Sequence, residues 1–525
     1  MATPRLSSLF AFHLPREVAR CARWVLSLVL LFSAGHQAFS GDLPRRPNIV
    51  VILADDLGYG DVKCFNANGK IATPNIDRLA ASGMMFTDAN SPSSICSPTR
   101  YALLTGRYAW RSRLKSGVLG GLSPRLIEPK RLTVAQLLKD NGYHTACLGK
   151  WHLGMDWQLK PGKNVNPLGI ESRAQVYNVE YDKPIKNGPN ALGFDYYFGI
   201  AASLDMVPYT FIENDRVAAN PTEDRDFAMV LGKEAGARCR KGPAAPGFEA
   251  ENVLPTLTKK AVQYIGERAK AKSPFFLYLP LASPHTPILP TQEWRNKSGL
   301  NPYADFVMAT DKAIGDVTAA LKANGIENNT LVIFTSDNGC APMADFPALL
   351  KLGHNPNSIF RGHKADIFEG GHRVPFIARW PEKIQPGSKS DRLICHSDIL
   401  ATCADAIGVQ LPNAAGEDSI SFTGAWTRAK DAPRREGLVV QSANGSFAIR
   451  EGKWKFCKCA GSGGWSQPRP GTKEEVGLPA VQLYDLDADI GETKNLQSEH
   501  PEIVARLAKL LEKWTKEGRS TPAKQ

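Results

Sequence analysis

The chain has 525 residues, of which 43% are hydrophobic, 9% aromatic and 22% charged. These are ordinary globular proportions, and they exclude a disordered, collagen-like or coiled-coil protein as a description of the whole chain. The length exceeds the roughly 250–300 residues at which a single core stops growing, so we expect a large domain with a smaller one appended. The 64 basic and 52 acidic residues give a net charge of +12, which is typical of a protein that meets a polyanion: nucleic acid, an anionic membrane, or a sulfated or phosphorylated substrate.

Residues 1–40 predict a secretory signal peptide. Four arginines precede a short apolar run at 24–34, and Ala38-Phe39-Ser40 supplies a small-x-small cleavage site. The apolar run is about half of the ~20 residues that a spanning helix needs, so a retained anchor is the alternative. We therefore expect a protein exported to a periplasmic, extracellular or luminal compartment without stable membrane insertion. Removal of residues 1–40 would leave a net charge of +9.

Strand-like and helix-like segments alternate over the next part of the chain, which we assign to one domain at 41–412. Continuous apolar runs predict buried parallel strands at 48–54, 144–148, 275–281, 331–335 and 374–380. Amphipathic patterns predict helices at 73–84, 133–141, 253–271, 303–324 and 397–408. This alternation predicts an α/β fold: a large, mostly parallel sheet sandwiched by helices.

The remaining residues, 413–525, differ in character. Short strand-like pieces at 437–441, 447–450, 454–457 and 481–484 precede an amphipathic helix at 500–516. They predict a small antiparallel sheet with one packed helix. Two irregular stretches of the larger domain, 154–190 and 215–250, are too long for plain connections, and we expect them to cover a binding face.

Oxygen-bearing side chains follow two of the predicted parallel strands. Asp55 and Asp56 end the first strand, while Asp337 and Asn338 follow the strand at 331–335. The carboxyl ends of parallel strands form the ligand crevice of such a sheet. Taken alone, Asp55-Asp56 could equally be a solvated acidic turn. Together the four side chains suit Ca²⁺ or Mg²⁺, since nothing nearby has the spacing of a zinc site.

Two lysines and two histidines also lie near strand ends. Lys150 and His152 follow the strand at 144–148 and, two residues apart in an extended segment, share a face. His285 follows the strand at 275–281, and Lys364 precedes the strand at 374–380. Each of these residues taken alone is more often structural, but their shared placement beside strand ends favours a role in the same crevice.

The segment Cys96-Ser97-Pro98-Thr99-Arg100 is the most specific motif. Pro98 near the start of a helical run places Cys96 at a helix N-terminus and Arg100 about one turn along. A cysteine in isolation would be structural. However, Cys-Ser-Pro-Thr-Arg, completed here by Leu-Thr-Gly-Arg at 104–107, is the sequence in which sulfatases have a cysteine oxidised to formylglycine. The chain thus resembles the formylglycine-dependent (type I) sulfatases of the alkaline-phosphatase superfamily. Further family landmarks follow in order at 149–154, 283–287 and 483–486.

The resemblance implies an alkaline-phosphatase-like fold and a role for each candidate residue. A maturation enzyme would convert Cys96 to formylglycine, whose hydrate attacks sulfur with help from Asp337. The metal, Ca²⁺ or possibly Mg²⁺, would be bound by Asp55, Asp56, Cys96, Asp337 and Asn338. Sulfuryl oxygens would be held by Lys150 and Lys364, with Arg100 bracing the formylglycine and the carboxylates. His285 would protonate the leaving oxygen, and His152 would take the proton that releases sulfate. Ser203, in a more variable segment, would offer a hydroxyl near the formylglycine.

Several alternatives to a sulfatase stay open. A phosphodiesterase or phosphonate monoester hydrolase of the same superfamily is one, and a non-catalytic sulfated-glycan-binding protein with an unmodified Cys96 is another. A plain thiol hydrolase using Cys96 with His152 leaves the paired carboxylates without a role. Nucleic-acid binding is disfavoured because no basic helix accompanies the charge.

The irregular inserts suggest a sulfated carbohydrate, such as a carrageenan, fucan or glycosaminoglycan, as substrate. This expectation rests on two tryptophans and three cations: Trp157, Trp294, Arg173, His372 and Arg373. Eight cysteines besides Cys21 and Cys96 form an even number that is compatible with disulfides. The sequence leaves the oligomeric state open.

Overall fold

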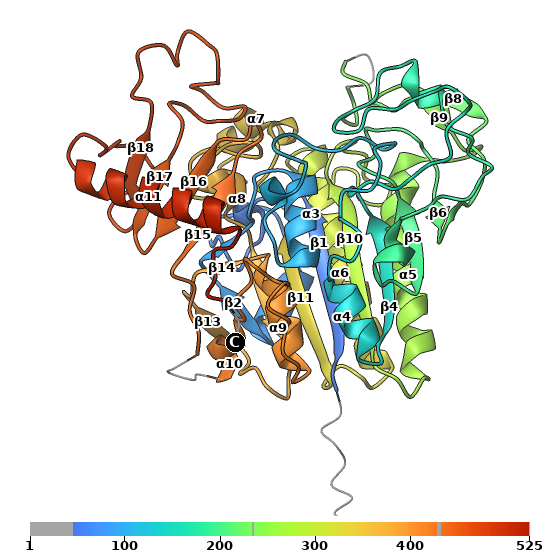
Figure 1. Cartoon of the computed structure of the whole chain (residues 1–525). Coiled ribbons are helices and arrows are strands. Elements are labelled where there is room, and N and C mark those ends of the chain that lie inside the picture. Colours follow the sequence, from blue (N-terminus) through green and yellow to red (C-terminus); the bar gives the residue numbers. More distant parts are fainter. Residues whose placement is uncertain (1–45, 234–235, 428–431, 524–525) are drawn as a thin grey trace, which may run out of the picture. The chain divides into compact units, whose positions relative to one another are not determined.

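A computed structural model describes residues 46–233, 236–427 and 432–523. The predicted signal peptide at 1–40 lies outside these residues. Residues 46–525 form one compact unit built on a ten-stranded mixed sheet, with strand order β13-β2-β12-β11-β1-β10-β4-β5-β6-β7 (Figure 1). The α/β fold expected from the sequence is confirmed.

Five adjacent parallel strands form the centre of this sheet. They are β11 (Thr330–Ser336), β1 (Asn48–Asp55), β10 (Phe275–Pro284), β4 (His144–Lys150) and β5 (Tyr196–Ile200). Every residue of β1, β10 and β11 is buried. Their uninterrupted apolar runs are explained by this burial on both faces. Because all five strands run the same way, their carboxyl ends lie along one edge of the sheet.

The strand predicted at 374–380 is present, but its predicted direction is wrong. Strand β12 (Phe376–Arg379) pairs antiparallel with β11, with Val332 opposite Arg379 and Thr335 opposite Phe376. An apolar run indicates that a strand is buried, but it does not indicate whether the strand is parallel or antiparallel to its neighbour. The connection from β11 carries only the short helices α7 (Phe346–Lys351) and α8 (Glu369–His372), so the chain re-enters the sheet from the edge at which it left.

Helices cover both faces of the sheet, as expected. Helices α3 (Cys96–Thr105), α4 (Val134–Asp140) and α9 (Asp398–Ala406) pack together and lie in front of the sheet in Figure 1. Helices α2 (Pro74–Ala81), α5 (Val253–Ala269) and α6 (Pro302–Ala323) form a second packed group. All the helices predicted from the sequence are found, within about three residues at each end.

The C-terminal segment forms a four-stranded antiparallel sheet with one packed helix, also as expected. Its strands, in order, are β15 (Gly437–Gln441), β16 (Phe447–Glu451), β17 (Trp454–Cys457) and β18 (Gln482–Asp485), and the helix is α11 (Pro501–Glu517). Residues of this sheet and helix share a hydrophobic cluster with Tyr108 and Trp110, which follow α3. The small sheet is thereby anchored next to the helix that begins at Cys96.

The other strands and helices are short. They are β2 (Met84–Phe86), β3 (Ala89–Asn90), β6 (Ile212–Glu213), β7 (Arg216–Val217), β8 (Glu223–Arg225), β9 (Gly242–Ala244), β13 (Ser388–Ser390), β14 (Ile394–Cys395) and α10 (Thr423–Thr427). The nine cysteines within the described residues are all free, so the disulfides that the sequence allowed do not form there. In this part of the chain no helix is both long and apolar enough to cross a bilayer.

Candidate active site

The carboxyl edge of the parallel strands gathers the candidate residues. Asp55 is the last residue of β1, Lys150 is the last residue of β4, and His285 directly follows β10. Asp337 and Asn338 follow β11, and Ser203 lies three residues after β5. All of these side chains are buried, and so are those of Cys96, Arg100, His152 and Lys364. The fold therefore brings together residues that are up to 309 positions apart in the chain.

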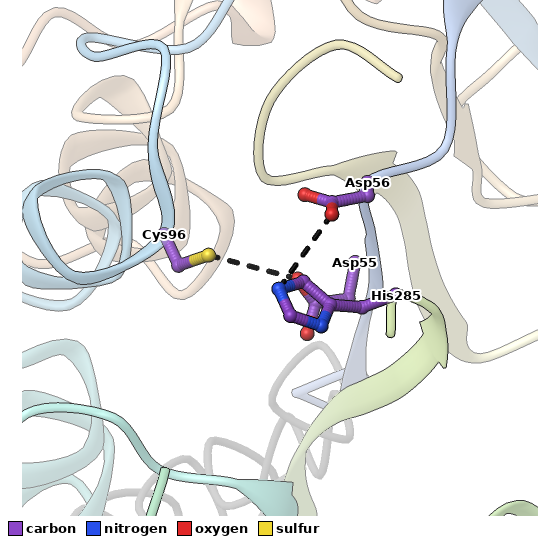
Figure 2. Close-up of side chains that lie close together, drawn as sticks. All are labelled: Asp55, Asp56, Cys96 and His285. Atoms are coloured by element: carbon purple, nitrogen blue, oxygen red, sulfur yellow. Dashed lines mark hydrogen bonds and ion pairs between the residues drawn. The ribbon is translucent and has the colours of Figure 1, made fainter. Parts of the chain in front are cut away.

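Three of these side chains form a compact group with the buried side chain of Asp56. One ligand atom from each of Asp55, Asp56, Cys96 and His285 lies within 4.8 Å of the others. Figure 2 shows the Cys96 thiol reaching Asp55 from the start of α3, at 3.8 Å between Sγ and Oδ1, and His285 facing Asp56. The His285 Nε2 is 3.6 Å from Asp56 Oδ2. His285 thus joins the group, whereas the sequence resemblance implied Asp337 and Asn338 as the further ligands.

Two buried ammonium groups contact the paired carboxylates. Lys150 Nζ donates to Asp55 Oδ2 at 2.6 Å, and Lys364 Nζ donates to Asp56 Oδ2 at 2.8 Å. Burial alone would raise the pKa of Asp55, but the nearby charges, led by Lys150, outweigh it and hold that pKa well below its ordinary value. The site keeps Asp55 ionised and places positive charge on both sides of the carboxylate pair.

Arg100 connects the cysteine helix to two strand ends. Its guanidinium donates to Asp337 Oδ2 at 2.8 and 3.2 Å and to the Lys150 carbonyl at 2.9 Å, and it lies 3.4 Å from Asp55 Oδ2. Asp337 in turn accepts the backbone N–H of Asp56 at 3.2 Å. Burial and the neighbouring Asp55 charge raise the pKa of Asp337 to about 6, although Arg100 opposes this. Asp337 is therefore easier to protonate than Asp55.

Asn338 provides the test of whether a cation suits the site. Its Nδ2 donates to Asp56 Oδ1 at 2.7 Å. The amide oxygen of Asn338 itself is buried and has no hydrogen-bond donor among the described residues. A buried carbonyl oxygen without a donor is unfavourable unless another positive group meets it. Two aspartates with an amide oxygen are the hard oxygen donors that Ca²⁺ and Mg²⁺ prefer, so the residues present fit a divalent cation.

The two histidines have their tautomers set by backbone carbonyls. His152 Nε2 lies 2.9 Å from the Leu119 carbonyl and must donate to it, so Nδ1 carries a lone pair. That Nδ1 is buried and has no described partner, and burial holds the pKa of His152 well below its usual value. In His285 the arrangement is reversed: Nδ1 donates to the Thr286 carbonyl at 2.6 Å, and Nε2 faces Asp56. The two rings thus present different nitrogens to the site: Nδ1 of His152 and Nε2 of His285.

Ser203 lies in the segment that supports His152. The neighbouring Ala201 carbonyl accepts the His152 N–H at 2.9 Å, and the Ser203 hydroxyl is buried without a hydrogen-bond partner in the described part of the chain. A buried hydroxyl without a partner can bind a polar ligand group.

Two further contacts, which could not be predicted from the sequence, orient the site. Ser97 Oγ accepts the Leu119 N–H at 3.2 Å, so the loop that fixes His152 is itself held by the cysteine motif. The Tyr303 hydroxyl contacts Asp61 and donates to the Asp56 carbonyl at 3.1 Å, where the backbone of Asp56 takes the left-handed conformation with φ 62°. Leu119 acts through its backbone, and Tyr303 lies in a plain helical pattern, so neither leaves a signal in the sequence.

The residues that suggested a saccharide substrate are mostly buried or paired with other residues. His372 and Arg373 are buried and contact Glu369. His372 Nε2 lies 3.5 Å from Glu369 Oε1, and Arg373 donates from two nitrogens to Glu369 Oε2. Trp157 is buried and donates to the Gly121 carbonyl at 3.1 Å, while Arg173 is exposed and paired with Asp224. His372, Arg373 and Trp157 therefore do not support the expected saccharide substrate, because their side chains are buried in the interior of the protein.

Comparisons with known proteins agree with this geometry. The protein family described as Sulfatase matches residues 47–409. An N-acetylgalactosamine-6-O-sulfatase of Bacteroides thetaiotaomicron is 34% identical over 514 residues, covering 91% of this chain and 94% of that protein. Human arylsulfatase A is 32% identical over 505 residues, covering 92% and 90%.

Solved structures give the same result. One, from work on the metabolism of multiple glycosaminoglycans by Bacteroides thetaiotaomicron, aligns with a TM-score of 0.76 at 33% identity and covers 89% of this chain and 99% of that one. Another, i-CgsB in complex with k-i-k-neocarrahexaose, has a TM-score of 0.64 at 26% identity and covers 91% and 94%. With this coverage of sequence and fold, the chain belongs to the sulfatase family of the alkaline-phosphatase superfamily, and it is a sulfuric ester hydrolase.

Proposed function

We propose that this sulfatase removes sulfate from a sulfated carbohydrate derived from a polysaccharide, using a formylglycine made from Cys96 and a bound divalent cation, Ca²⁺ or Mg²⁺. The observation that carries the proposal is the pairing of two buried ammonium groups, Lys150 and Lys364, with the adjacent carboxylates beside Cys96. A site with this charge distribution suits a compact anionic head group, such as a sulfate ester, rather than a neutral ester. The carbohydrate part is supported by relatives named as acting on N-acetylgalactosamine 6-sulfate or bound to neocarrahexaose.

Asp55, Asp56 and Asn338 would hold the cation, with Asp337 close by through Asp56 and Arg100. When present, the cation supplies charge for the sulfuryl oxygens and the formylglycine hydrate supplies an oxygen nucleophile. Lys150 and Lys364 would bind those same oxygens, and Arg100 would keep Asp337 and Asp55 in place. In this proposal each lysine would donate both to its aspartate and to a sulfuryl oxygen.

The two histidines would divide the proton transfers. His285, with Nδ1 donating to the Thr286 carbonyl, would carry a proton on Nε2 for the leaving alcohol oxygen. His152, with Nε2 donating to the Leu119 carbonyl, has a free Nδ1 that would accept the proton released when sulfate departs. The acid role requires the doubly protonated ring of His285, with the Nε2–H facing Asp56 Oδ2 at 3.6 Å.

The test has two parts. Peptide mass spectrometry over residues 91–100 of natively produced, active protein should show formylglycine, and an unmodified thiol in that active protein would overturn the mechanism. Sulfate release, measured by ion chromatography, should then be screened over position-defined sulfated saccharides: N-acetylgalactosamine 6-sulfate, chondroitin 6-sulfate oligosaccharides, sulfated fucose and carrageenan oligosaccharides. An aryl phosphate diester and a phosphonate monoester serve as controls. Preferential turnover of the phosphorus esters would favour the related phosphohydrolases.

We also propose that the protein is exported, with the signal peptide at 1–40 removed and Cys96 converted by a maturation enzyme of the producing cell. Mass spectrometry of the protein recovered outside the cytoplasm should give an N-terminus at Gly41. Recovery of the intact N-terminus in a membrane fraction would show a retained anchor instead.

A further inference from the structure

Trp465 stands apart from the other tryptophans of the described chain. Its exposed fraction is 43%, whereas the tryptophans of the hydrophobic clusters are buried or partly buried. It lies in the long loop between β17 and β18 of the C-terminal sheet. A single exposed aromatic side chain is common on a protein surface, so its significance depends on where the loop lies.

The loop that carries Trp465 packs directly on the segment that carries Lys364. The Asp366 carboxylate accepts the backbone N–H groups of Trp465 and Ser466 at 2.8 and 3.0 Å, and the Ser466 hydroxyl at 2.6 Å. At Gly464 an added Cβ would lie 2.3 Å from the Ala365 carbonyl oxygen, so only glycine permits this close approach. Trp465 therefore stands beside the residues that immediately follow the active-site lysine.

The loop is also held firmly in this position. The Ile367 N–H donates to the Ser462 carbonyl at 2.7 Å, and the turn is closed by a bond of 2.8 Å from the Ser462 N–H to the Pro468 carbonyl. Arg469 Nε donates to the Trp465 carbonyl at 2.7 Å. An exposed aromatic ring on a fixed backbone loses little conformational freedom when a ligand covers it.

We propose that Trp465 is a specificity-determining residue that packs against the face of a sugar ring adjoining the sulfated residue. This inference rests on the proposed function, because it needs a saccharide substrate. One face of a pyranose ring presents C–H groups, which pack well on a flat indole, while the hydroxyl groups point outward. In this proposal, a sulfate bound at Lys364 would bring the next sugar unit on this side of the site to the C-terminal loop, whose backbone packs on Ala365 and Asp366. A small aryl sulfate would end before it reaches Trp465.

Steady-state kinetics on the full-length, natively matured protein test this. For Trp465→Ala, KM for the best sulfated oligosaccharide of the panel above, expected to be a chondroitin 6-sulfate oligosaccharide, should rise about tenfold with kcat changed less than threefold. Trp465→Phe, which keeps a flat ring, should stay within about threefold of the wild type in KM. Both variants should hydrolyse 4-nitrocatechol sulfate with kcat/KM within about twofold of the wild type.

Leu478→Ala is the matched control, because Leu478 lies in the same loop with an exposed fraction of 40%. It should leave both substrates unaffected. Calorimetric titration of the oligosaccharide into Cys96→Ala protein, with and without Trp465→Ala, should show the same loss of affinity without any turnover.

Three outcomes overturn the inference. Equal loss on the oligosaccharide and on 4-nitrocatechol sulfate would mean that Trp465 acts on the fold, and unchanged oligosaccharide kinetics would mean that it makes no contact. If the wild-type protein cleaves no sulfated saccharide while cleaving the aryl sulfate, the proposed function itself fails and the role of Trp465 fails with it. Failure of the proposed function appears already in the wild type, whereas failure of the Trp465 role appears only in the variants, so the two failures are distinguishable.

Discussion

A buried ion cluster fastens the C-terminal sheet to the segment that carries Lys364, and it allows a quantitative prediction. Lys455 of β17 has a fully buried ammonium group, 3.1 Å from Glu369 Oε1 and 2.8 Å from Glu492 Oε1. Glu492 also accepts the Glu369 backbone N–H at 2.6 Å through its other oxygen. Glu369 keeps a second partner in Arg373, so Lys455 is the main counter-charge of Glu492.

Replacing Lys455 with methionine leaves the Glu492 carboxylate buried without this counter-charge. Breaking a buried pair in this way destabilises a protein by about 3–5 kcal/mol. For a unit of about 480 residues, an unfolding entropy near 2.1 cal/mol/K per residue amounts to ~1 kcal/mol/K, so Tm should fall by about 3–5 °C.

The loss should also depend on pH. Burial raises the pKa of Glu492 most strongly, Lys455 opposes it, and the smaller effect of the Glu369 charge raises this pKa too. Without Lys455 this pKa rises further, so the folded variant binds more protons than the unfolded chain and its stability falls as pH increases. The Tm difference from the wild type should therefore be smaller at pH 5 than at pH 8.

Differential scanning calorimetry at both pH values provides the measurement. Lys453→Met is the control, since Lys453 lies two residues away and its pair with Asp485 is partly exposed, for which we expect about 0–1 kcal/mol. The double variant Lys455→Met/Glu492→Gln should recover most of the lost stability. A Tm change in Lys455→Met no larger than in the control, or a larger loss at pH 5 than at pH 8, would refute the reasoning.

Further predictions concern the site itself. Cys96→Ala should abolish hydrolysis of an aryl sulfate while leaving the circular dichroism spectrum unchanged, and wild-type-like turnover would contradict the assignment of Cys96. Lys364→Met and Lys150→Met should each lower kcat/KM for the same substrate by about 10²–10³, because each removes a charge from the sulfuryl oxygens. Treatment with EDTA should remove activity and lower Tm, and Ca²⁺ at 100 times its Kd should restore about 2.7 kcal/mol of stability; an unchanged Tm would argue against a structural cation. Tyr303→Phe, which leaves Asp61 and the Asp56 carbonyl short of a donor, should destabilise the protein by about 1–3 kcal/mol in denaturant titrations, and an effect below 0.5 kcal/mol would show that water replaces the hydroxyl.

Much of the fold could be predicted because its elements have strong local signals. The central strands are apolar along their whole length, and the helices carry regular amphipathic patterns, so β1, β10, α5 and α6 were expected nearly at their observed bounds. The direction of β12 could not be predicted, since a short buried run looks the same in both directions. Short strands such as β2 and β13 are too brief to stand out in a sequence pattern.

The sequence alone indicated candidate residues, because the motif pointed to Cys96 and strand-end positions pointed to Asp55 and Lys150. How these side chains meet depends on the fold. It placed His285 beside Asp56, fixed the tautomer of His152 through the Leu119 carbonyl, and left the Asn338 oxygen without a donor. It also buried His372 and Arg373 while exposing Trp465 next to the Lys364 segment. Residue type and spacing indicate which chemistry a side chain can perform. Its hydrogen-bond partners and its burial depend on segments hundreds of residues apart, which only folding brings together.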